Sequence, residues 1–594
     1  MIRLSFTEIN SFVGDIFPLR LISDEGELKN RDIKWQLYGD AIALRAFENG
    51  RPAFSDGVLL IFNAEGECEV TATLDGVEYK AKVCSRAISE NGEELTYFRA
   101  DLHDHTSLNH NPEEFATQKY GRIEDYLDFI NREGLYDATV ISDHAELLND
   151  YIFFHGFALT REGEYNNVIT FAGAESEIVY TERDRLGIEH RLSGEIVTIN
   201  SAGYAFSKDF STLEKELSTS PMPIAIFAHP HVIGYSTNGI WCFDFKRRST
   251  PEMLRVVRGI EMGNGNDRGE NLLHEYAISS ALDAGFRVST TCSTDEHGPD
   301  WSYNKVNGKT IIMARERSRE AFILALRENR FYASESGNVK LRYTVNDITA
   351  PCDLPLATEY KFHIDISYFK EDESSHPKKI MVISDYGKTV YELDANEKSS
   401  FDFCVESTTA RYFYLRIVDM RGRKTWSMPV WCGREFDKLC EEKLTNIDMS
   451  SVSAYYNEAE IPALINGNPF DSVLFDTATP EITIDMGATR KISAIGYYPH
   501  IILRDEKKGE GWTTSDESRG LVSHYKIEAS IDGKAYTELC CGVCCDLGIE
   551  NIIRFPCANA RYIRFIVLGT VGSSSYLTKY INAPARIGNL SLFE

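Results

Sequence analysis

The segment Asp101-Leu102-His103-Asp104-His105-Thr106 determines the fold prediction for the middle of this chain. It ends a short apolar stretch, 97–102, that predicts a β-strand, so two imidazoles are expected to project to one side at a strand's end. Neutral imidazole is among the commonest protein ligands for divalent metals. The segment therefore predicts part of a metal site whose other ligands come from elsewhere in the chain.

Candidate partners follow in order, each after its own short apolar run. They are Ser142-Asp143-His144, Gly173-Ala174-Glu175, Ala228-His229-Pro230 and Ser293-Thr294-Asp295-Glu296-His297. Ten of the 14 histidines lie from His103 to His297. One such motif would mean little, but the ordered set predicts a metal centre.

Short strands alternate with helical segments throughout this region, which predicts parallel strands joined by helical crossovers. In a closed sheet of this kind, reactive groups gather at the carboxyl ends of the strands, where all the motifs fall. A helix with apolar residues at helical spacing is expected from Ile123 until Gly134 ends it. The other predicted strands are 138–142, 168–172, 196–200, 224–228, 260–262 and 288–292, and the other helices include 270–284 and 318–329.

Length and composition indicate a multidomain globular protein of 594 residues, with 43% hydrophobic and 11% aromatic residues. No apolar run approaches the roughly 18 residues of a membrane span. The N-terminus carries Glu8 and Asp15 where a secretory signal would have its apolar core. We therefore expect a cytoplasmic protein with no membrane partner.

Charge and cysteine content argue against a nucleic-acid-binding protein and a disulfide-rich protein. The formal net charge is -27, with 63 Lys plus Arg against 90 Asp plus Glu, which disfavours a nucleic acid polymer but not a small phosphate held by metal ions. The 13 cysteines are an odd number, scattered over a long chain, and reduced thiols are expected. Cys541 and Cys544 form a CxxC, but no second pair or nearby histidine completes a zinc site.

The predicted fold class is multidomain, α/β plus all-β. We expect an immunoglobulin-like β-sandwich over 1–94, with a hairpin at Asp75-Gly76, an α/β barrel over 95–337 and a second sandwich over 338–434. A linker, 435–459, leads to an all-β domain over 460–594 with a hairpin signal at Ile531-Asp532-Gly533-Lys534.

Residues 98–335 resemble the PHP family, named for polymerase and histidinol phosphatase, whose members are metal-dependent phosphoesterases. The family motifs DxHxHT, SDH, GxE, HP and SDxH have counterparts here in the right order. The resemblance implies a distorted barrel of about seven strands, a (β/α)7 barrel, holding two or three divalent ions such as zinc, manganese or iron.

Carried over residue by residue, the resemblance implies three ion sites, and Glu175 is implied to bridge the first two. Glu175, Asp295 and His297 are the candidate catalytic residues. The first ion is implied to be held by His103, His105, Glu175 and Asp295, the second by His229, Glu175 and His190, and the third by His110, His144 and His297. His231 is an alternative to His229, and Asp104 and Glu296 are expected to point away.

The chemistry of such a set agrees with this assignment. A carboxylate that bridges two cations about 3.5 to 4 Å apart lets them convert a shared water into hydroxide near neutral pH and bind phosphate oxygens. Glu261 ends a strand and is expected to support a ligand histidine. Arginines in loops are candidates for clamping a phosphate: Arg161, Arg183, Arg185, Arg247 and Arg268.

Residues from about 460 resemble a coagulation-factor type C, or discoidin, domain, an eight-stranded jelly roll. The residues that carry this are 465–468, 482–487, 525–533, 560–565 and 588–592. Many relatives bind sugars, so a glycan is a candidate partner. The usual tryptophan is replaced by Leu474 and Phe475, an insertion, 504–520, contains Trp512, and a purely packing role is an alternative.

The leading hypothesis is a metal-dependent phosphoesterase that hydrolyses a small phosphate ester, for example of a sugar or nucleotide, with a metal-activated hydroxide. A second hypothesis keeps the metals but cleaves an amide, ester or sulfate. A third is a carbohydrate-binding protein with a non-catalytic barrel.

Overall fold

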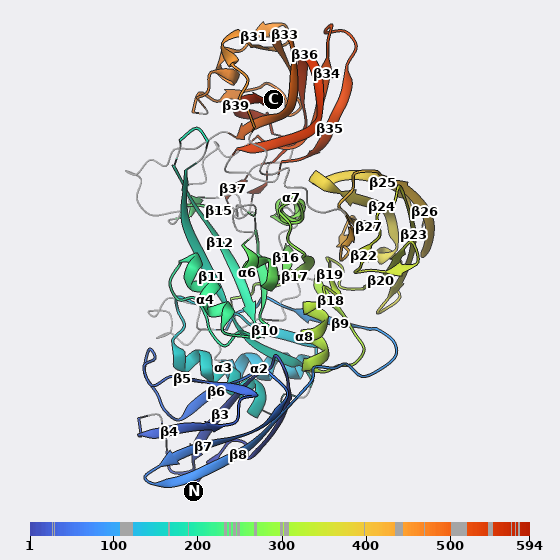
Figure 1. The fold of residues 1–594 in the computed structure, drawn as a ribbon. Helices are drawn as coiled ribbons and strands as arrows, with labels where there is room; N and C mark the ends of the chain where they lie inside the picture. The colour runs from blue at the N-terminus through green and yellow to red at the C-terminus, as the bar shows by residue number, and fades with distance from the viewer. Residues whose placement is uncertain are drawn as a thin grey trace.

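Sheet-rich units follow one another along the chain in the computed structural model, from the N-terminal domain to the C-terminal domain at the opposite end (Figure 1). The structure describes the whole chain except residues 27, 29, 107–122, 164, 166, 184, 188, 231–234, 237–238, 242–244, 246–249, 266–269, 298–300, 302–307, 397, 434–443, 469, 500–519, 545–549, 572, 576–577 and 580–582. Among the helices that it describes, none is long and apolar enough to cross a membrane.

The N-terminal domain has two four-stranded sheets with a shared apolar core. One sheet has the order β1-β3-β6-β5 and the other β2-β8-β7-β4. Asp75 and Gly76 both adopt positive φ and join β7 to β8, so the predicted two-residue hairpin is confirmed. The strands are β1 (Ile2–Leu4), β2 (Glu8–Phe12), β3 (Ile16–Ser23), β4 (Ile33–Tyr38), β5 (Ile42–Ala46), β6 (Gly57–Phe62), β7 (Gly66–Leu74) and β8 (Val77–Arg86).

The middle region is a curled sheet with helices around it. Its strands are β9 (Thr96–Asp101), β10 (Ala138–Ile141), β11 (Ile169–Arg183), β12 (Glu189–Ile199), β13 (Ile224–Ala228), β14 (Tyr235–Ser236), β15 (Gly239–Trp241), β16 (Val257–Asn264), β17 (Ser289–Ser293), β18 (Lys309–Ala314) and β19 (Phe331–Ser334). Its helices are α2 (Ile123–Glu133), α3 (Asp150–Glu162), α4 (Phe210–Ser218), α6 (Pro251–Val256), α7 (Glu270–Asp283) and α8 (Arg319–Arg327).

The pairing order of the curled sheet is β17-β16-β13-β12-β11-β10-β9-β18-β19. It curls far enough for β17 to contact β18 and β19. α2, described from Ile123 to Glu133, buries the predicted apolar face, and Gly134 follows it with φ 59°, so the predicted helix and its end are confirmed. Ser318 caps α8 by accepting a hydrogen bond from the backbone N–H of Ala321.

The expectation of parallel strands throughout is wrong for part of this sheet. β9, β10 and β11 are parallel neighbours, as are β13, β16 and β17, but β12 is antiparallel to both β11 and β13. The physical reason is that β11 and β12 run on far beyond the predicted strands 168–172 and 196–200. The short connection then left between them has no room for a helical crossover, so the strands pair as an antiparallel ribbon.

The second sandwich is joined to the curled sheet by strand pairing. β28 (Lys424–Trp426) pairs with β19 on one side and with β27 (Tyr412–Asp419) on the other. The sheet therefore crosses the expected boundary at 337/338, and the apolar core crosses it too. The other elements are β20 (Val339–Val345), β21 (Ile348–Thr349), β22 (Asp353–Leu354), β23 (Glu359–Tyr368), β24 (Pro377–Ser384), β25 (Lys388–Asp394), β26 (Ser400–Glu406), β29 (Val430–Cys432) and the 3₁₀ turns Glu373–Ser375 and Asp385–Gly387.

The C-terminal domain is an all-β unit with one apolar core. Part of the expected linker belongs to it, since Ile447 and Val452 are buried in that core and two strands fall within 453–460. Its elements are β30 (Ser453–Tyr456), β31 (Ala459–Glu460), β32 (Val473–Leu474), β33 (Glu481–Pro499), β34 (Leu521–Ser530), β35 (Thr537–Val543), β36 (Asn551–Val571), β37 (Ser573–Ser575), β38 (Thr578–Lys579), β39 (Arg586–Phe593) and the 3₁₀ turns Met449–Ser451 and Pro462–Ile465. The described cysteines are all free thiols.

Candidate metal centre

The carboxyl ends of several strands of the curled sheet bring histidines and carboxylates into one buried cluster. His103 and His105 directly follow β9, His144 follows β10, and His229 is the first residue after β13. Asp295 and His297 follow β17. The prediction that the motifs lie at strand ends agrees with where the structure places these residues, but Glu175 lies inside β11, which runs on beyond the predicted end at 172.

The first group of ligand atoms comes from His103, His105, Glu175 and Asp295. One atom from each lies within 4.8 Å of the others. His103 Nε2 lies 3.1 Å from Glu175 Oε1, and His105 Nε2 lies 2.9 Å from Asp295 Oδ1. The two histidine Nε2 atoms are 3.2 Å apart. Two imidazoles and two carboxylates thus converge on one point.

Glu175 also contacts two further histidines. His229 Nε2 lies 3.1 Å from Glu175 Oε1, and His144 Nδ1 lies 3.1 Å from Glu175 Oε2. The Glu175 side chain is 0% exposed. A single buried carboxylate that touches four histidines from three different segments is placed to bridge cations.

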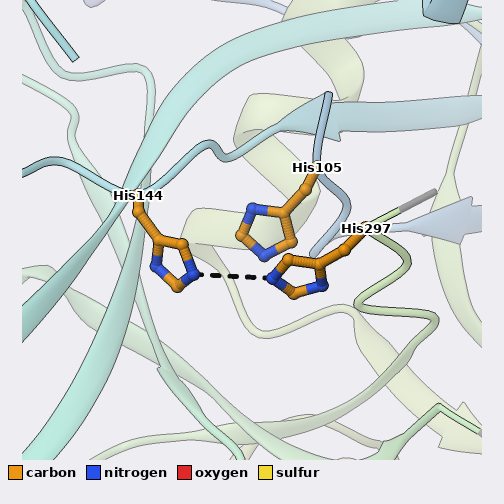
Figure 2. A group of neighbouring side chains, drawn as sticks. All are labelled: His105, His144 and His297. Atoms are coloured by element: carbon orange, nitrogen blue, oxygen red, sulfur yellow. Dashed lines mark hydrogen bonds between the residues drawn. The ribbon is translucent and has the colours of Figure 1, made fainter. Parts of the chain in front are cut away.

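A third group is made of three imidazoles, from His105, His144 and His297 (Figure 2). The Nε2 atoms of His144 and His297 are 3.5 Å apart, and the rings of His105 and His297 stack with centroids 4.1 Å apart. His297 Nδ1 lies 3.0 Å from the backbone carbonyl oxygen of Asp295. If Nδ1–H donates to that oxygen, Nε2 is the nitrogen left for a ligand.

Glu261, in β16, contacts several residues of the cluster and holds them in place. Its Oε1 lies 3.3 Å from His103 Nδ1, and its Oε2 accepts hydrogen bonds from the backbone N–H of His229 and the amide of Asn264 at 2.8 and 2.9 Å. The same amide donates to Asp295 Oδ2 at 2.9 Å. This arrangement holds His103 with Nε2 toward the cluster, which is the role expected of Glu261.

Two residues of the cluster have unusual backbone conformations. His229 has φ 24° and Asp295 has φ 50°, a region that residues other than glycine adopt at a cost of about 1–3 kcal/mol. Such strain persists at positions where the side chain must be aimed for function.

Glu195, in β12, is a cluster residue that the sequence motifs did not reveal. Its side chain is 8% exposed, and its Oε2 lies 3.2 Å from His229 Nε2. One atom each from His144, Glu175 and Glu195 lies within 4.8 Å of the others. The available signal was weak, a lone carboxylate in the apolar strand segment Gly194-Glu195-Ile196-Val197.

The ionisation of the cluster is coupled. Burial lowers the pKa of His103, but the negative charges of Glu175, Asp295 and Glu261 outweigh it and leave that pKa well above its usual value. Burial, aided by the charge of His297, lowers the pKa of His105 to about 3. Burial raises the pKa of Glu175, yet the charges of His103 and His144 hold it well below the ordinary value. Protons on imidazoles thus balance the carboxylates here.

The carboxylates and imidazoles of this cluster are suitable ligands for two metal ions. Four carboxylates share the cluster, and their ion-pair partners among the described residues are all histidines. Glu175 Oε2 and Asp295 Oδ1 are buried oxygens that face the imidazoles of His144 and His105 at 3.1 and 2.9 Å without a well-oriented hydrogen bond from the described residues. Buried negative charge is costly unless positive charge compensates it, and metal ions would take the place of the imidazole protons. The four carboxylates are Glu175, Glu195, Glu261 and Asp295.

The remaining candidates lie elsewhere or beyond the described part of the chain. His110, His231, Arg247 and Arg268 lie outside the described residues. The backbone of His190 pairs with Glu182 in the β11–β12 ribbon, but its side chain is outside the described set. Asp104 accepts a hydrogen bond from the His105 N–H and belongs to none of the ligand groups.

Two of the candidate phosphate-clamping arginines are engaged by other domains, and the expectation that they clamp a phosphate is wrong. Arg161 forms an ion pair with Asp15 of the N-terminal domain. Arg185 donates from Nε to Glu550 Oε2 at 3.0 Å and from Nη2 to Ser591 Oγ at 3.1 Å, both in the C-terminal domain. The reason is that Arg185 lies between β11 and β12, and the ribbon that these strands form extends toward that domain (Figure 1).

Metal uptake by this cluster is expected to release protons. Burial lowers the pKa of His144, but the charge of Glu175 raises it to about 10, and burial with the charge of Glu175 raises the pKa of Glu195 to about 7. Ligands must be deprotonated, so apparent affinity should rise as pH rises from about 6 to about 8. Calorimetric titration in buffers of different ionisation enthalpy measures the protons released. Affinity and proton release that do not change with pH would contradict this prediction.

Comparison with known proteins found no matching family model and no matching curated protein. A two-domain protein from Bacteroides vulgatus, described as containing a predicted PHP-like metal-dependent phosphoesterase, matches 56% of this chain and 94% of its own, with 15% identity and a TM-score of 0.29. CBM32-3 from a family 31 glycoside hydrolase of Clostridium perfringens matches 25% of this chain and 94% of its own, with 24% identity and a TM-score of 0.20. A family 32 CBM from C. perfringens in complex with galactose matches 26% and 100%, with 18% identity and a TM-score of 0.19. All three likenesses are at 24% identity or less.

Proposed function

We propose that the chain is a metal-dependent phosphoesterase of the PHP type, whose curled sheet corresponds to the PHP barrel. Its substrate is a small phosphate ester, with a sugar or nucleotide as the esterified group. The observation that carries the proposal is the buried cluster in which Glu175 contacts His103, His105, His144 and His229. It would hold two or three divalent ions of zinc, manganese or iron.

Divalent cations bound there would lower the pKa of a water ligand toward neutrality and take up charge that develops on the phosphate. The chain's own contribution is orientation. Glu261 fixes the ring of His103, and Asn264 fixes Asp295 by donating to Oδ2, which leaves Oδ1 facing His105. Because His103, His105 and Glu175 are almost fully buried, bulk water does not compete for their ligand atoms.

Chelation is the first test of this function. Treatment of the full chain with a chelator is expected to abolish hydrolysis across a panel of phosphomonoesters and phosphodiesters, and added metal should restore it. Asp295→Asn is expected to remove activity in the same assay, because the neutral amide cannot replace the carboxylate oxygen beside His105. Activity that survives both changes would exclude the proposal.

The same panel separates the second hydrolase hypothesis. A bound hydroxide can attack an amide, carboxylic ester or sulfate as well as a phosphate. Turnover of one of these compounds, with no phosphate ester cleaved, would assign the cluster to that bond instead. We propose that the enzyme acts in the cytoplasm, which localisation of a tagged full-length chain tests.

For the C-terminal domain we propose a packing role rather than glycan capture. The contacts of Arg185 with Glu550 and Ser591 tie this domain to the β11–β12 ribbon. The Arg185 guanidinium also lies 5.0 Å from the centre of the Phe593 ring. A glycan array probed with the full chain tests the alternative, and specific binding to a sugar would overturn the purely packing role.

A further inference from the structure

The register of β12 places one particular carboxylate at the centre. Glu195 pairs with Glu177 of β11 on one side and with Ala228 of β13 on the other, and Glu175 pairs with Val197. Glu195 is therefore the diagonal neighbour of Glu175 on the same face of the sheet. On the other side, its partner Ala228 is directly followed by His229, so Glu195 and His229 are near neighbours across the two strands. A charged residue in this apolar strand thus stands between two residues of the cluster.

The two oxygens of Glu195 face two different histidines. Oε2 lies 3.2 Å from His229 Nε2, and Oε1 lies 3.9 Å from His144 Nδ1. His229 Nε2 lies 3.1 Å from Glu175 Oε1, so one imidazole nitrogen is shared by two carboxylates. One ligand atom each from His144, Glu175 and Glu195 also lies within 4.8 Å of the others. This is the arrangement of a ligand set.

Comparison with Glu177 shows that glutamates in the β11–β12 ribbon do not all contact histidines of the cluster. The two glutamates are directly paired and share a face, but Glu177 forms an ion pair with Lys208, whereas the ion-pair partners of Glu195 among the described residues are histidines. Lys208 therefore already neutralises Glu177. Among the described residues, only imidazoles balance the charge of Glu195, as expected of a ligand for a cation.

The backbone of His190 lies five residues from Glu195 along β12. At about 3.3 Å per residue this is about 17 Å along the strand. Such a separation exceeds the reach of an imidazole side chain, whereas the carboxylate of Glu195 is already at the cluster.

We infer that Glu195 takes the ligand position expected for His190, so that Glu175, Glu195 and His229 hold the second cation, and that this carboxylate-rich set binds Mn2+ better, relative to Zn2+, than a set with a third imidazole would. This inference rests on the proposed metal-dependent function and specifies its second ion. Carboxylate oxygens suit manganese, whereas a third imidazole would shift the set toward zinc. The group of His105, His144 and His297 offers the contrasting all-imidazole environment.

The test measures binding of Mn2+ and Zn2+ alone to the full chain, by competition with a chromophoric chelator and by metal analysis after gel filtration. Glu195→Gln is expected to weaken one Mn2+ site by more than the roughly 10- to 100-fold that loss of a supporting hydrogen bond costs. Glu177→Gln is the matched control, with the same charge removed at the paired position, and should bind as the wild type does. Glu195→His should raise the preference for Zn2+ over Mn2+ by about tenfold or more.

The outcomes separate this inference from the proposed function. Equal Mn2+ number and affinity in the wild type and Glu195→Gln overturns the inference, whatever the hydrolase activity. Ion uptake by the wild type with no phosphate ester cleaved overturns the function and leaves the ligand assignment standing. If Glu195→Gln does not fold, as judged by circular dichroism, Glu195→His decides, and an unchanged Zn2+ to Mn2+ preference in that variant overturns the inference.

Discussion

Glu175→Gln is expected to reduce hydrolysis by at least about a thousandfold, the upper end of what loss of one preorganised stabilising group costs. Glutamine keeps the size of the side chain but removes its charge and replaces one ligand oxygen with an amide. Both oxygens of Glu175 are in use, since Oε1 lies 3.1 Å from His103 and His229 and Oε2 lies 3.1 Å from His144. One substitution therefore breaks every set that shares this carboxylate.

The measurement pairs metal content per chain with the rate of phosphate ester hydrolysis. Glu175→Gln should lose at least one bound ion, whereas Glu261→Gln, which removes only a support of His103, should bind the full number with affinity about 10- to 100-fold weaker. Loss of an ion in one variant and only weaker binding in the other would distinguish a bridging ligand from a residue that orients a ligand. A fully loaded Glu175→Gln protein with near-normal turnover would rule out the bridging role.

The parts of the site that could be predicted from the sequence are those tied to local chain geometry. His103 and His105 follow directly on a short apolar strand, and Asp295 follows another, so their positions depend only on where a strand ends. The supporting role of Glu261 was also predicted, although β16 runs on to Asn264 and Glu261 lies inside the strand rather than at its end. The helix from Ile123 and the turn at Asp75-Gly76 were likewise legible from spacing and turn chemistry.

Glu195 could not be predicted because its position depends on register. Nothing in Gly194-Glu195-Ile196-Val197 distinguishes this carboxylate from one that faces solvent on a strand. It reaches the cluster because β12 runs antiparallel to both β11 and β13, and a slip of one residue would turn it to the other face. The sequence pattern predicted a crossover at this point, so the ribbon and its carboxylate were missed together.

The boundary between the barrel and the second sandwich was missed for a related reason. The periodicity of strands changes near 338, which predicts a new domain, but hydrogen bonding across that point is a non-local property. β19 and β28 form the junction, and Ala333 pairs with Trp426 there. Two regions that the sequence pattern separates into domains thus share one sheet, and we expect the stability of the ligand cluster to depend on the sandwich.

Trp426→Ala is expected to lower the free energy of unfolding of this shared unit by about 3–5 kcal/mol. The Trp426 side chain is fully buried in the core that also contains Ala277 and Ile278 of α7 and Met381 of the sandwich. Its carbonyl accepts a hydrogen bond from Thr290 Oγ1 of β17 at 2.7 Å. Removing the indole leaves a cavity between the curled sheet and the sandwich, so both sides lose packing at once.

Denaturant unfolding, followed by far-UV circular dichroism and by release of bound metal, measures this effect. In Trp426→Ala the two signals should move together to lower denaturant, because the sheet that carries Asp295 after β17 is continuous in packing with β28. Trp426→Phe, which retains an aromatic ring in the cavity, should lose substantially less stability. Metal release that keeps its wild-type midpoint while the sandwich unfolds early would show that the two parts are independent, and the shared β19–β28 sheet would then have no role in holding the ligand cluster.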